Sequence, residues 1–191
     1  MRVSVFCSSS AKVNPVYLKA AHRLGKMLAE NRIAVNYGGG GVGLMGKLAD
    51  TMISLGGSIR GIIPEFMVEQ GWNHPGLEDM VVVRDMHERM KRINQGVDGF
   101  IALPGGFGTM TELLETITMK QLGQILHPVV IVNTNHYFDP FIRIVESMVE
   151  QHFIRDIHID IFSVVSEPEE VLDAIHNAPE WDGSKIEYAP V

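Results

Sequence analysis

The stretch Leu103-Pro-Gly-Gly-Phe-Gly-Thr-Met-Thr-Glu112 joins an apolar segment to a helical pattern through a glycine-rich turn. The apolar segment, 100–103, is typical of a short strand buried on both faces of a parallel sheet. The glycines permit backbone angles and a close ligand approach that side chains would prevent, and they leave free N–H groups at the start of the helix. These donors and the positive end of the helix dipole favour a phosphate. The stretch therefore predicts a phosphate-binding loop with a carboxylate beside it.

Glu112 has two interpretations. Thr109-Met-Thr-Glu112 fits the Thr-x-x-Glu capping box, in which the glutamate only closes the start of the helix onto the backbone. A carboxylate one turn into a helix, beside a bound phosphate, is also well placed to stabilise positive charge developing on a sugar. The spacing alone leaves both interpretations open.

Two further loops follow expected strands. Tyr37-Gly-Gly-Gly-Gly-Val-Gly-Leu-Met-Gly46 contains the dinucleotide-binding pattern G-x-G-x-x-G, but a strand and a helix precede it, which disfavours nicotinamide binding and leaves a structural tight turn as an alternative. Cys7-Ser-Ser-Ser10 offers hydroxyls and amides to a base, ribose or phosphate, or is an ordinary polar loop. All three loops end expected parallel strands, and ligands bind open α/β sheets at that edge.

Strand and helix patterns alternate along the chain. The expected strands lie near 3–6, 33–37, 59–63, 80–83, 100–103, 128–132 and 161–165, and the expected helices near 15–30, 42–55, 86–96, 109–123, 140–151 and 168–176. This alternation predicts βαβ units with right-handed crossovers. We expect an α/β fold, a single doubly wound Rossmann-like domain over residues 1–191. Its mostly parallel sheet has about seven strands with helices on both faces, and 177–191 form a surface tail.

Composition narrows the class of protein. The 191 residues are 46% apolar, which suffices for one sizeable core, and the formal net charge of −7 disfavours extended binding to nucleic acid or an anionic membrane. The chain starts directly with a strand pattern, and no apolar run is long enough for a bilayer. One cysteine excludes an internal disulfide framework and fits a reducing cytoplasm, where we expect the protein. The histidines lack metal-ligand spacing, so we predict no metal.

A local positive site is available in Asp85-Met-His-Glu-Arg-Met-Lys-Arg92. Arg89 is our candidate for the ligand, because its guanidinium matches the geometry of phosphate or carboxylate. The alternative is a solvated helix face on which these arginines pair with Asp85 and Glu88 at helical spacing. The sequence leaves both open.

Four motifs together resemble the LOG family, whose members are cytokinin riboside 5′-monophosphate phosphoribohydrolases long mislabelled as lysine decarboxylases. The motifs are Phe6-Cys-Ser-Ser-Ser10, Tyr37-Gly-Gly-Gly-x-x-Gly-Leu-Met-Gly46, Met86-His-Glu-Arg89 and Pro104-Gly-Gly-x-Gly-Thr-x-x-Glu112. Their order and spacing match the family from the first strand to about residue 154. The last of the four is specific for it.

The resemblance implies hydrolysis of the N-glycosidic bond of an adenosine-type nucleoside 5′-monophosphate to free base and ribose 5-phosphate, with no cofactor. Arg89 and Glu112 become the catalytic pair, with Glu112 stabilising an oxocarbenium-like sugar and handling the attacking water. The substrate-binding residues implied are Ser8, Ser9, Gly39, Gly40, Gly43, Met45, Glu69, Gly105, Gly106, Gly108, Thr109 and Thr118. The family resemblance also implies that the protein is a homodimer. Its only expected small-molecule partner is the nucleoside 5′-monophosphate.

Departures from the family pattern concern the substrate more than the reaction. Met90 stands where many relatives carry lysine, Ser8 replaces a usual glycine, Thr111 replaces a frequent glutamate, and Met119-Lys120 replaces tryptophan-alanine. Both a cytokinin nucleotide and AMP therefore remain candidate substrates. A non-catalytic nucleotide carrier or sensor on the same fold is the alternative function. A lysine decarboxylase would need a lysine for pyridoxal phosphate, and none lies on the three loops.

Overall fold

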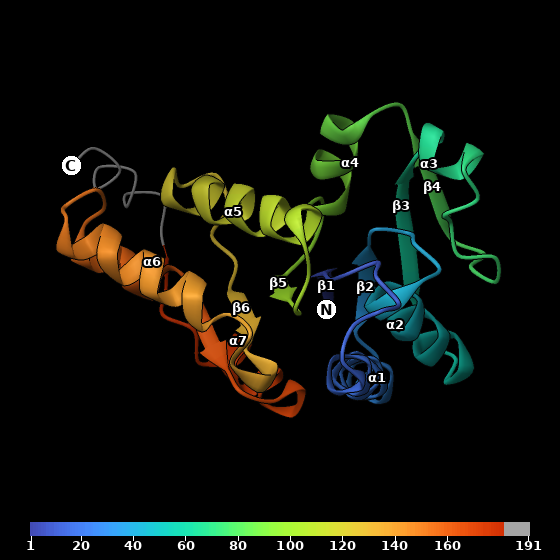
Figure 1. The fold of residues 1–191 in the computed structure, drawn as a ribbon, viewed down its shortest axis with the longest axis horizontal. Coiled ribbons are helices and arrows are strands. Elements are labelled where there is room, and N and C mark those ends of the chain that lie inside the picture. Colours follow the sequence, from blue (N-terminus) through green and yellow to red (C-terminus); the bar gives the residue numbers. More distant parts are fainter. Residues whose placement is uncertain (182–191) are drawn as a thin grey trace.

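The computed structural model describes residues 1–181, which form one seven-stranded sheet with helices on both faces (Figure 1). The strand order is β4-β3-β2-β1-β5-β6-β7, and every neighbouring pair is parallel. The strands are β1 (Arg2–Phe6), β2 (Ala34–Tyr37), β3 (Ile59–Pro64), β4 (Met80–Val83), β5 (Gly99–Ala102), β6 (Val129–Val132) and β7 (Ser163–Val165). This confirms the doubly wound α/β fold.

Apart from the short helix α3, which was not expected, the helices lie close to their expected positions. They are α1 (Pro15–Glu30), α2 (Gly43–Ser54), α3 (Glu65–Glu69), α4 (Met86–Ile93), α5 (Phe107–Gln121), α6 (Asp139–Glu150) and α7 (Val171–His176), with 3₁₀ turns at Thr134–His136, Asp156–Ile161 and Pro168–Glu170. The start of α1 shows why its bounds match the prediction. Asn14 caps the helix by accepting from the N–H of Val16, and Pro15 occupies the first turn.

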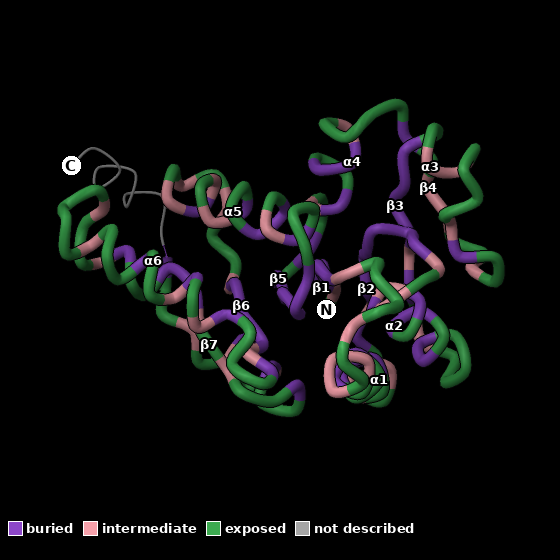
Figure 2. Tube along the Cα trace, in the orientation of Figure 1, coloured by how far each residue is buried: buried purple, intermediate pink, exposed green. Residues whose placement is uncertain are grey.

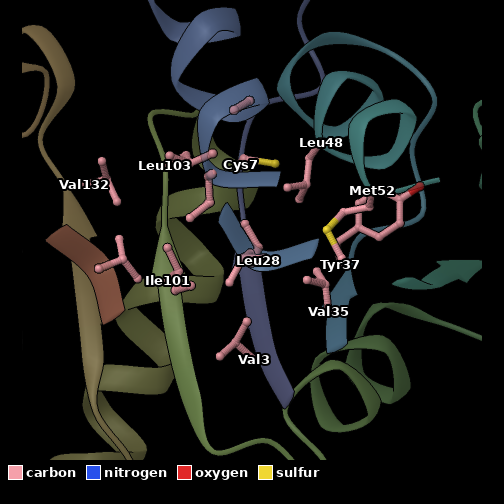
Figure 3. Packing of buried hydrophobic residues seen from close by; sticks show 14 of the residues in the cluster. Val3, Cys7, Leu28, Val35, Tyr37, Leu48, Met52, Ile101, Leu103 and Val132 are labelled. Carbon is pink, nitrogen blue, oxygen red and sulfur yellow. The ribbon is translucent and has the colours of Figure 1, made fainter. Parts of the chain in front are cut away.

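Two apolar clusters cover the two faces of the sheet. On one face, α1, α2 and α7 pack against β1, β2, β5 and β6, and Figure 3 shows part of this cluster, including Leu28, Tyr37 and Met52. On the other face, α4, α5 and α6 bury Ile93, Leu113 and Phe141 against the same sheet. The central strands are buried along their length, as Figure 2 shows. Sandwiching between two helix layers explains their continuous aliphatic sequences.

The strand order reverses direction at β1, and this reversal determines where a ligand can bind. The chain runs outward from β1 to β4 and then returns to insert β5 on the other side of β1. The loops that leave the carboxyl ends of β1 and β5 therefore lead to opposite faces of the sheet. A crevice opens at such a switch point, and ligands of open α/β sheets bind there.

The end of the described chain packs on the core. The side chain of Trp181 is 6% exposed, and its indole N–H donates to the carbonyl oxygen of Lys120 on α5 at 2.8 Å. Residues 182–191, which belong to the expected surface tail, lie outside the described part. Among the helices of the described residues, none is long and apolar enough to cross a membrane.

Candidate active site

A cavity of about 640 Å³ lies at the switch point. Its lining comes from the loops after β1, β2 and β5, from the segment around α3, and from α4 and the first turns of α5. The size suits a nucleotide-sized ligand, since small-molecule sites usually enclose roughly 300–1,000 Å³. The lining residues are Cys7, Ser8, Ser9, Ser10, Gly38, Gly40, Val42, Met45, Ile63, Met67, Gly71, Trp72, Met86, Arg89, Gly106, Phe107, Gly108, Thr109 and Glu112.

The capping-box interpretation of Glu112 is wrong. Helix α5 begins at Phe107 with Gly106 as its N-cap, so Thr109 lies inside the first turn instead of before it. The Thr109 side chain instead packs on Gly105, where an added Cβ would lie 2.0 Å from the threonine Oγ1. Glu112 is consequently a residue of the helix body, and its carboxylate is free to face the cavity.

The loop before α5 has room for a ligand. An added Cβ at Gly106 or Gly108 would meet no protein atom within 4 Å, and both residues line the cavity. The carbonyl oxygen of Gly105 is held from outside by the hydroxyl of Tyr137, which donates to it. The N-terminus of a 15-residue helix thus opens into the cavity behind an anchored turn, which is a favourable place for an anion.

Arg89 and Glu112 form a buried ion pair. The Arg89 Nη2 lies 3.2 Å from the Glu112 Oε1, and the two side chains are 5% and 3% exposed. No hydrogen bond in the described residues is directed at that Oε1, so the carboxylate keeps acceptor capacity. Arg89 is oriented by its Nε, which donates to the carbonyl oxygen of Ile62 at 3.1 Å.

The structure shows which side of α4 faces the sheet and which side faces solvent. The exposed positions are taken by Lys91 and Arg92, while Arg89, Met90 and Ile93 turn inward. The solvated-face alternative therefore fails for Arg89, although Glu88 does pair with Arg92 as that pattern predicts. Met90 is buried and lines no part of the cavity.

Burial changes the acid–base chemistry of the cavity. Desolvation raises the pKa of Glu112 to about 7, while the nearby Arg89 charge opposes that rise and Glu115 adds to it. Burial likewise raises the pKa of the Cys7 thiol, with the Glu112 charge adding to the effect. The site therefore offers one carboxyl group that exchanges protons near neutral pH and a thiol that stays protonated.

Glycine packs the two N-terminal loops together. Gly43 has φ = 68°, and an added Cβ would lie 2.5 Å from the carbonyl oxygen of Ser10. The N–H of Met45 donates to the carbonyl oxygen of Ser8 at 3.1 Å, which ties the loops directly. Gly46 likewise has no room, because its Cβ would meet the Gly41 carbonyl. The G-x-G-x-x-G pattern here serves loop packing, as the tight-turn alternative predicts.

The segment after α3 closes the other side of the cavity. Asn73 forms an antiparallel bridge with Gly40, and Trp72 lines the cavity with its side chain half exposed. His74 anchors this segment: its Nδ1 accepts from the N–H of Gly76, and its Nε2 lies 3.1 Å from the Asp50 carboxylate on α2. The histidine therefore carries its proton on Nε2 and donates it to Asp50.

The predicted residues separate into two groups. The cavity brings together Ser8, Ser9, Gly40, Met45, Arg89, Gly106, Gly108, Thr109 and Glu112. Gly39 and Gly43 belong to the neighbouring backbone, and Gly105 lines a smaller adjoining cavity of about 150 Å³. Glu69 is exposed at the end of α3, and Thr118 is exposed on α5, where its hydroxyl donates to the Leu114 carbonyl. Neither of these two lines the cavity.

Sequence reasoning missed most of the apolar lining. Met67, Trp72, Met86 and Phe107 all line the cavity, and Phe107 is 94% exposed. The exposed aromatic in the Gly71-Trp-Asn73 segment was a usable signal, since a tryptophan in a polar turn is seldom left in solvent without a role. No lysine is among the described residues that line the cavity.

Comparisons with known proteins identify the family of the chain. A family model described as possible lysine decarboxylase matches residues 45–175. A probable cytokinin riboside 5′-monophosphate phosphoribohydrolase from Oryza sativa subsp. japonica is 40% identical over 154 residues, which are 81% of this chain and 69% of that protein. An Arabidopsis thaliana cytokinin riboside 5′-monophosphate phosphoribohydrolase is 36% identical over 99% of this chain and 92% of its own length.

Solved structures support the fold alone. A molybdenum cofactor carrier protein from Chlamydomonas reinhardtii superposes with a TM-score of 0.69 at 18% identity, covering 93% of this chain and 96% of that one. A molybdenum cofactor binding protein from Rippkaea orientalis gives 0.67 at 20% identity, with 92% and 94% covered. The sequence relatives, which are named cytokinin riboside 5′-monophosphate phosphoribohydrolases, and the family model together show that this chain belongs to the LOG family.

Proposed function

We propose that this protein hydrolyses the N-glycosidic bond of a nucleoside 5′-monophosphate, with a cytokinin riboside 5′-monophosphate or AMP as substrate. The observation that carries the proposal is the buried Arg89–Glu112 pair, which faces a nucleotide-sized cavity one helical turn from an open phosphate loop. The names of the relatives support the same reaction.

In this proposal the 5′-phosphate binds at the start of α5. Among the described hydrogen bonds, the N–H groups of Gly106 to Thr109 donate to no protein acceptor, and the positive end of the helix dipole faces the anion. Ser8 and Ser9 line the same cavity, the Ser8 N–H donates to the carbonyl oxygen of Pro104 beside this turn, and the two hydroxyls serve the ribose. The phosphate thereby fixes the sugar next to Glu112, and binding energy from the non-reacting end of the substrate orients the reacting end.

Glu112 and Arg89 then perform the chemistry. As the bond between C1′ and the base nitrogen breaks, its electron pair leaves with the base and positive charge spreads over the sugar, where the Glu112 carboxylate stabilises it. Glu112 also accepts a proton from the water that attacks C1′, and the departing base gains a proton, so one water is consumed overall. Arg89 holds the carboxylate in position and binds a sugar hydroxyl.

In this proposal the base binds against the apolar part of the cavity lining. Met67, Trp72, Met86 and Phe107 offer thioether and aromatic surface that suits a purine ring and an N6 hydrocarbon chain. This lining favours a cytokinin nucleotide over AMP. From the family resemblance of the sequence motifs we further propose a homodimer, and from the single cysteine a location in the cytoplasm; light scattering and fractionation of the host cells test these two proposals.

The decisive experiment is chromatographic detection of free base released from AMP and from isopentenyladenosine monophosphate. Glu112→Ala removes the carboxylate, and we expect it to lower turnover by about 10³-fold or more. Glu115→Ala, on the exposed side of the same helix, is the matched control and keeps wild-type turnover.

Two outcomes contradict the proposal. If wild-type protein binds both monophosphates and cleaves neither, the protein is a nucleotide carrier or sensor. If nucleosides without phosphate are cleaved as fast as the monophosphates, the loop before α5 has no role in recognising phosphate.

A further inference from the structure

A second cavity lies on the α4 side of the sheet, away from the candidate active site. It encloses about 290 Å³, and Arg2, Arg60 and Arg92 line it together with Asn36. No acidic residue is among its lining residues. Three arginines in one small cavity are unexpected in a chain whose net charge is −7.

The cationic cavity has a structural basis in strand register. Asn36 on β2 pairs with Arg60 on β3, and Arg2 lies near them on β1. These positions share the face that carries Ile62 and Phe6, which is apolar elsewhere. Helix α4 has only eight residues and leaves this end of the sheet open. Arginines here interrupt a surface that a doubly wound sheet normally fills with aliphatic side chains.

The arginine side chains are held in place. Arg2 Nη1 donates to the Oδ1 of Asn36 at 2.9 Å, and Asn36, which is 3% exposed, donates in turn to the carbonyl oxygen of Ile93 at 3.2 Å. A buried amide that is bonded on both sides therefore fixes the first guanidinium. Arg60 is held by the Asp79 carboxylate, whose oxygens both lie 3.0 Å from its Nε.

Much of the positive charge is left without a close partner. Among the described contacts the Arg2 side chain bonds only to the neutral amide of Asn36. Arg92 has Glu88 as its carboxylate, but the Nε–Oε1 distance is 3.8 Å, the Arg92 side chain is exposed and that of Glu88 is partly exposed. Such a pair contributes little. The free N–H groups of the two guanidinium ions are available to a ligand.

We propose that this cavity binds a small phosphate-bearing anion. Guanidinium forks match phosphate oxygens, and the two positive charges of Arg2 and Arg92, beside an Arg60 that Asp79 already pairs, suit a dianion. The volume is at the lower end of the range for ligand sites, which restricts the ligand to inorganic phosphate or a small phosphate monoester. The site is independent of the proposed hydrolytic activity.

The test follows arginine Nε and backbone amide resonances of isotope-labelled protein during titration with inorganic phosphate. We expect the Nε signals of Arg2, Arg60 and Arg92 to shift and saturate with one dissociation constant. The amides of Gly106 and Gly108 report the candidate active site separately. A parallel titration with ribose 5-phosphate shows whether free phosphate or a monoester binds more tightly, and either order supports the site.

Arg92→Gln and Lys91→Gln form the matched pair, because each removes one positive charge from the exposed side of α4 and Lys91 does not line the cavity. We expect Arg92→Gln to weaken phosphate binding at the arginines roughly tenfold and Lys91→Gln to leave it within about twofold. Arg2→Gln, on β1, is a second test, and we expect it to weaken phosphate binding as well. Shifts that do not saturate, or equal weakening by both α4 variants, would overturn the proposal, since either result indicates general attraction of anions to a positive surface.

Discussion

At the scale of single residues, the ionisation of Glu112 sets the pH dependence of the proposed activity. Its carboxylate form does the work, and burial raises the pKa to about 7. We predict that kcat/KM falls about tenfold for each pH unit below 7 and levels off above it. A pH–rate profile checks this, and a limb near 4.5, the ordinary value for glutamate, would contradict it.

The same group links pH to stability. Because the pKa of Glu112 is raised in the folded state, that state binds more protons than the unfolded chain between about pH 4.5 and 7. The contribution of Glu112 to the free energy of unfolding therefore declines as pH rises through this window, by up to about 3 kcal/mol. Subtracting the profile of Glu112→Gln from that of the wild type isolates this contribution, and a difference that rises with pH would refute the assigned burial effect.

At the scale of loops and helices, Gly43 is the critical contact between the loops after β1 and β2. Gly43→Ala must pay for a positive φ and for a Cβ 2.5 Å from the Ser10 carbonyl. The matched control is Gly56→Ala, which has φ = 67° and nothing within 4 Å of the new Cβ. We predict a loss of about 1 kcal/mol for Gly56→Ala and about 1–3 kcal/mol more for Gly43→Ala.

Denaturant unfolding of both variants measures this difference. Gly43→Ala should also raise KM, because the displaced loop carries Ser8 and Ser9. Equal losses of stability in the two variants would mean that the loops part without cost and that their close packing is unimportant.

Element positions were predictable where local signals coincide with packing. Asn14 and Pro15 mark the start of α1 in the sequence, and the structure begins the helix there. The five-residue α3 was not predicted, because it is too short to show a helical pattern in the sequence. Its position depends on the contacts of Asn73 and His74 with the loop after β2. That short helix turns Met67 toward the cavity and Glu69 to solvent.

The glycine-rich loops of the site could be predicted from the sequence, whereas the roles of its charged residues could be predicted less well. A glycine-rich turn indicates backbone angles or close approaches that only glycine allows, so it can be recognised from the sequence alone. Arg89, by contrast, is one of several charged residues on α4, and only the burial of Met90 and Ile93 reveals which side of the helix faces the sheet. Likewise, the capping box of Glu112 is a local pattern that the earlier start of α5 makes irrelevant.

At the scale of the whole molecule, Trp181 ties the end of the described chain to the core. Its ring packs near His158 and under the ammonium group of Lys120, whose pKa burial lowers to about 8. We predict that Trp181→Ala lowers the free energy of unfolding by about 3–5 kcal/mol. Trp72, the other tryptophan of the chain, is 55% exposed, and Trp72→Ala should leave stability nearly unchanged while weakening substrate binding.

Thermal unfolding and binding of the monophosphate, measured on both variants, separate the two tryptophans. A stable Trp181→Ala protein would mean that the Trp181 ring contributes nothing to the core. Substrate binding by Trp72→Ala at the wild-type level would remove that ring from the proposed base site.

The central place of β1 has a consequence for synthesis of the chain. β1 is made first, and its neighbour β2 follows after one helix, but its other neighbour, β5, begins only at Gly99. On the ribosome, one edge of β1 therefore has no partner while residues 7–98 are translated. An unpaired, aliphatic strand edge readily joins other chains. The nascent protein is thus most vulnerable to aggregation just before the strand that completes its ligand crevice emerges.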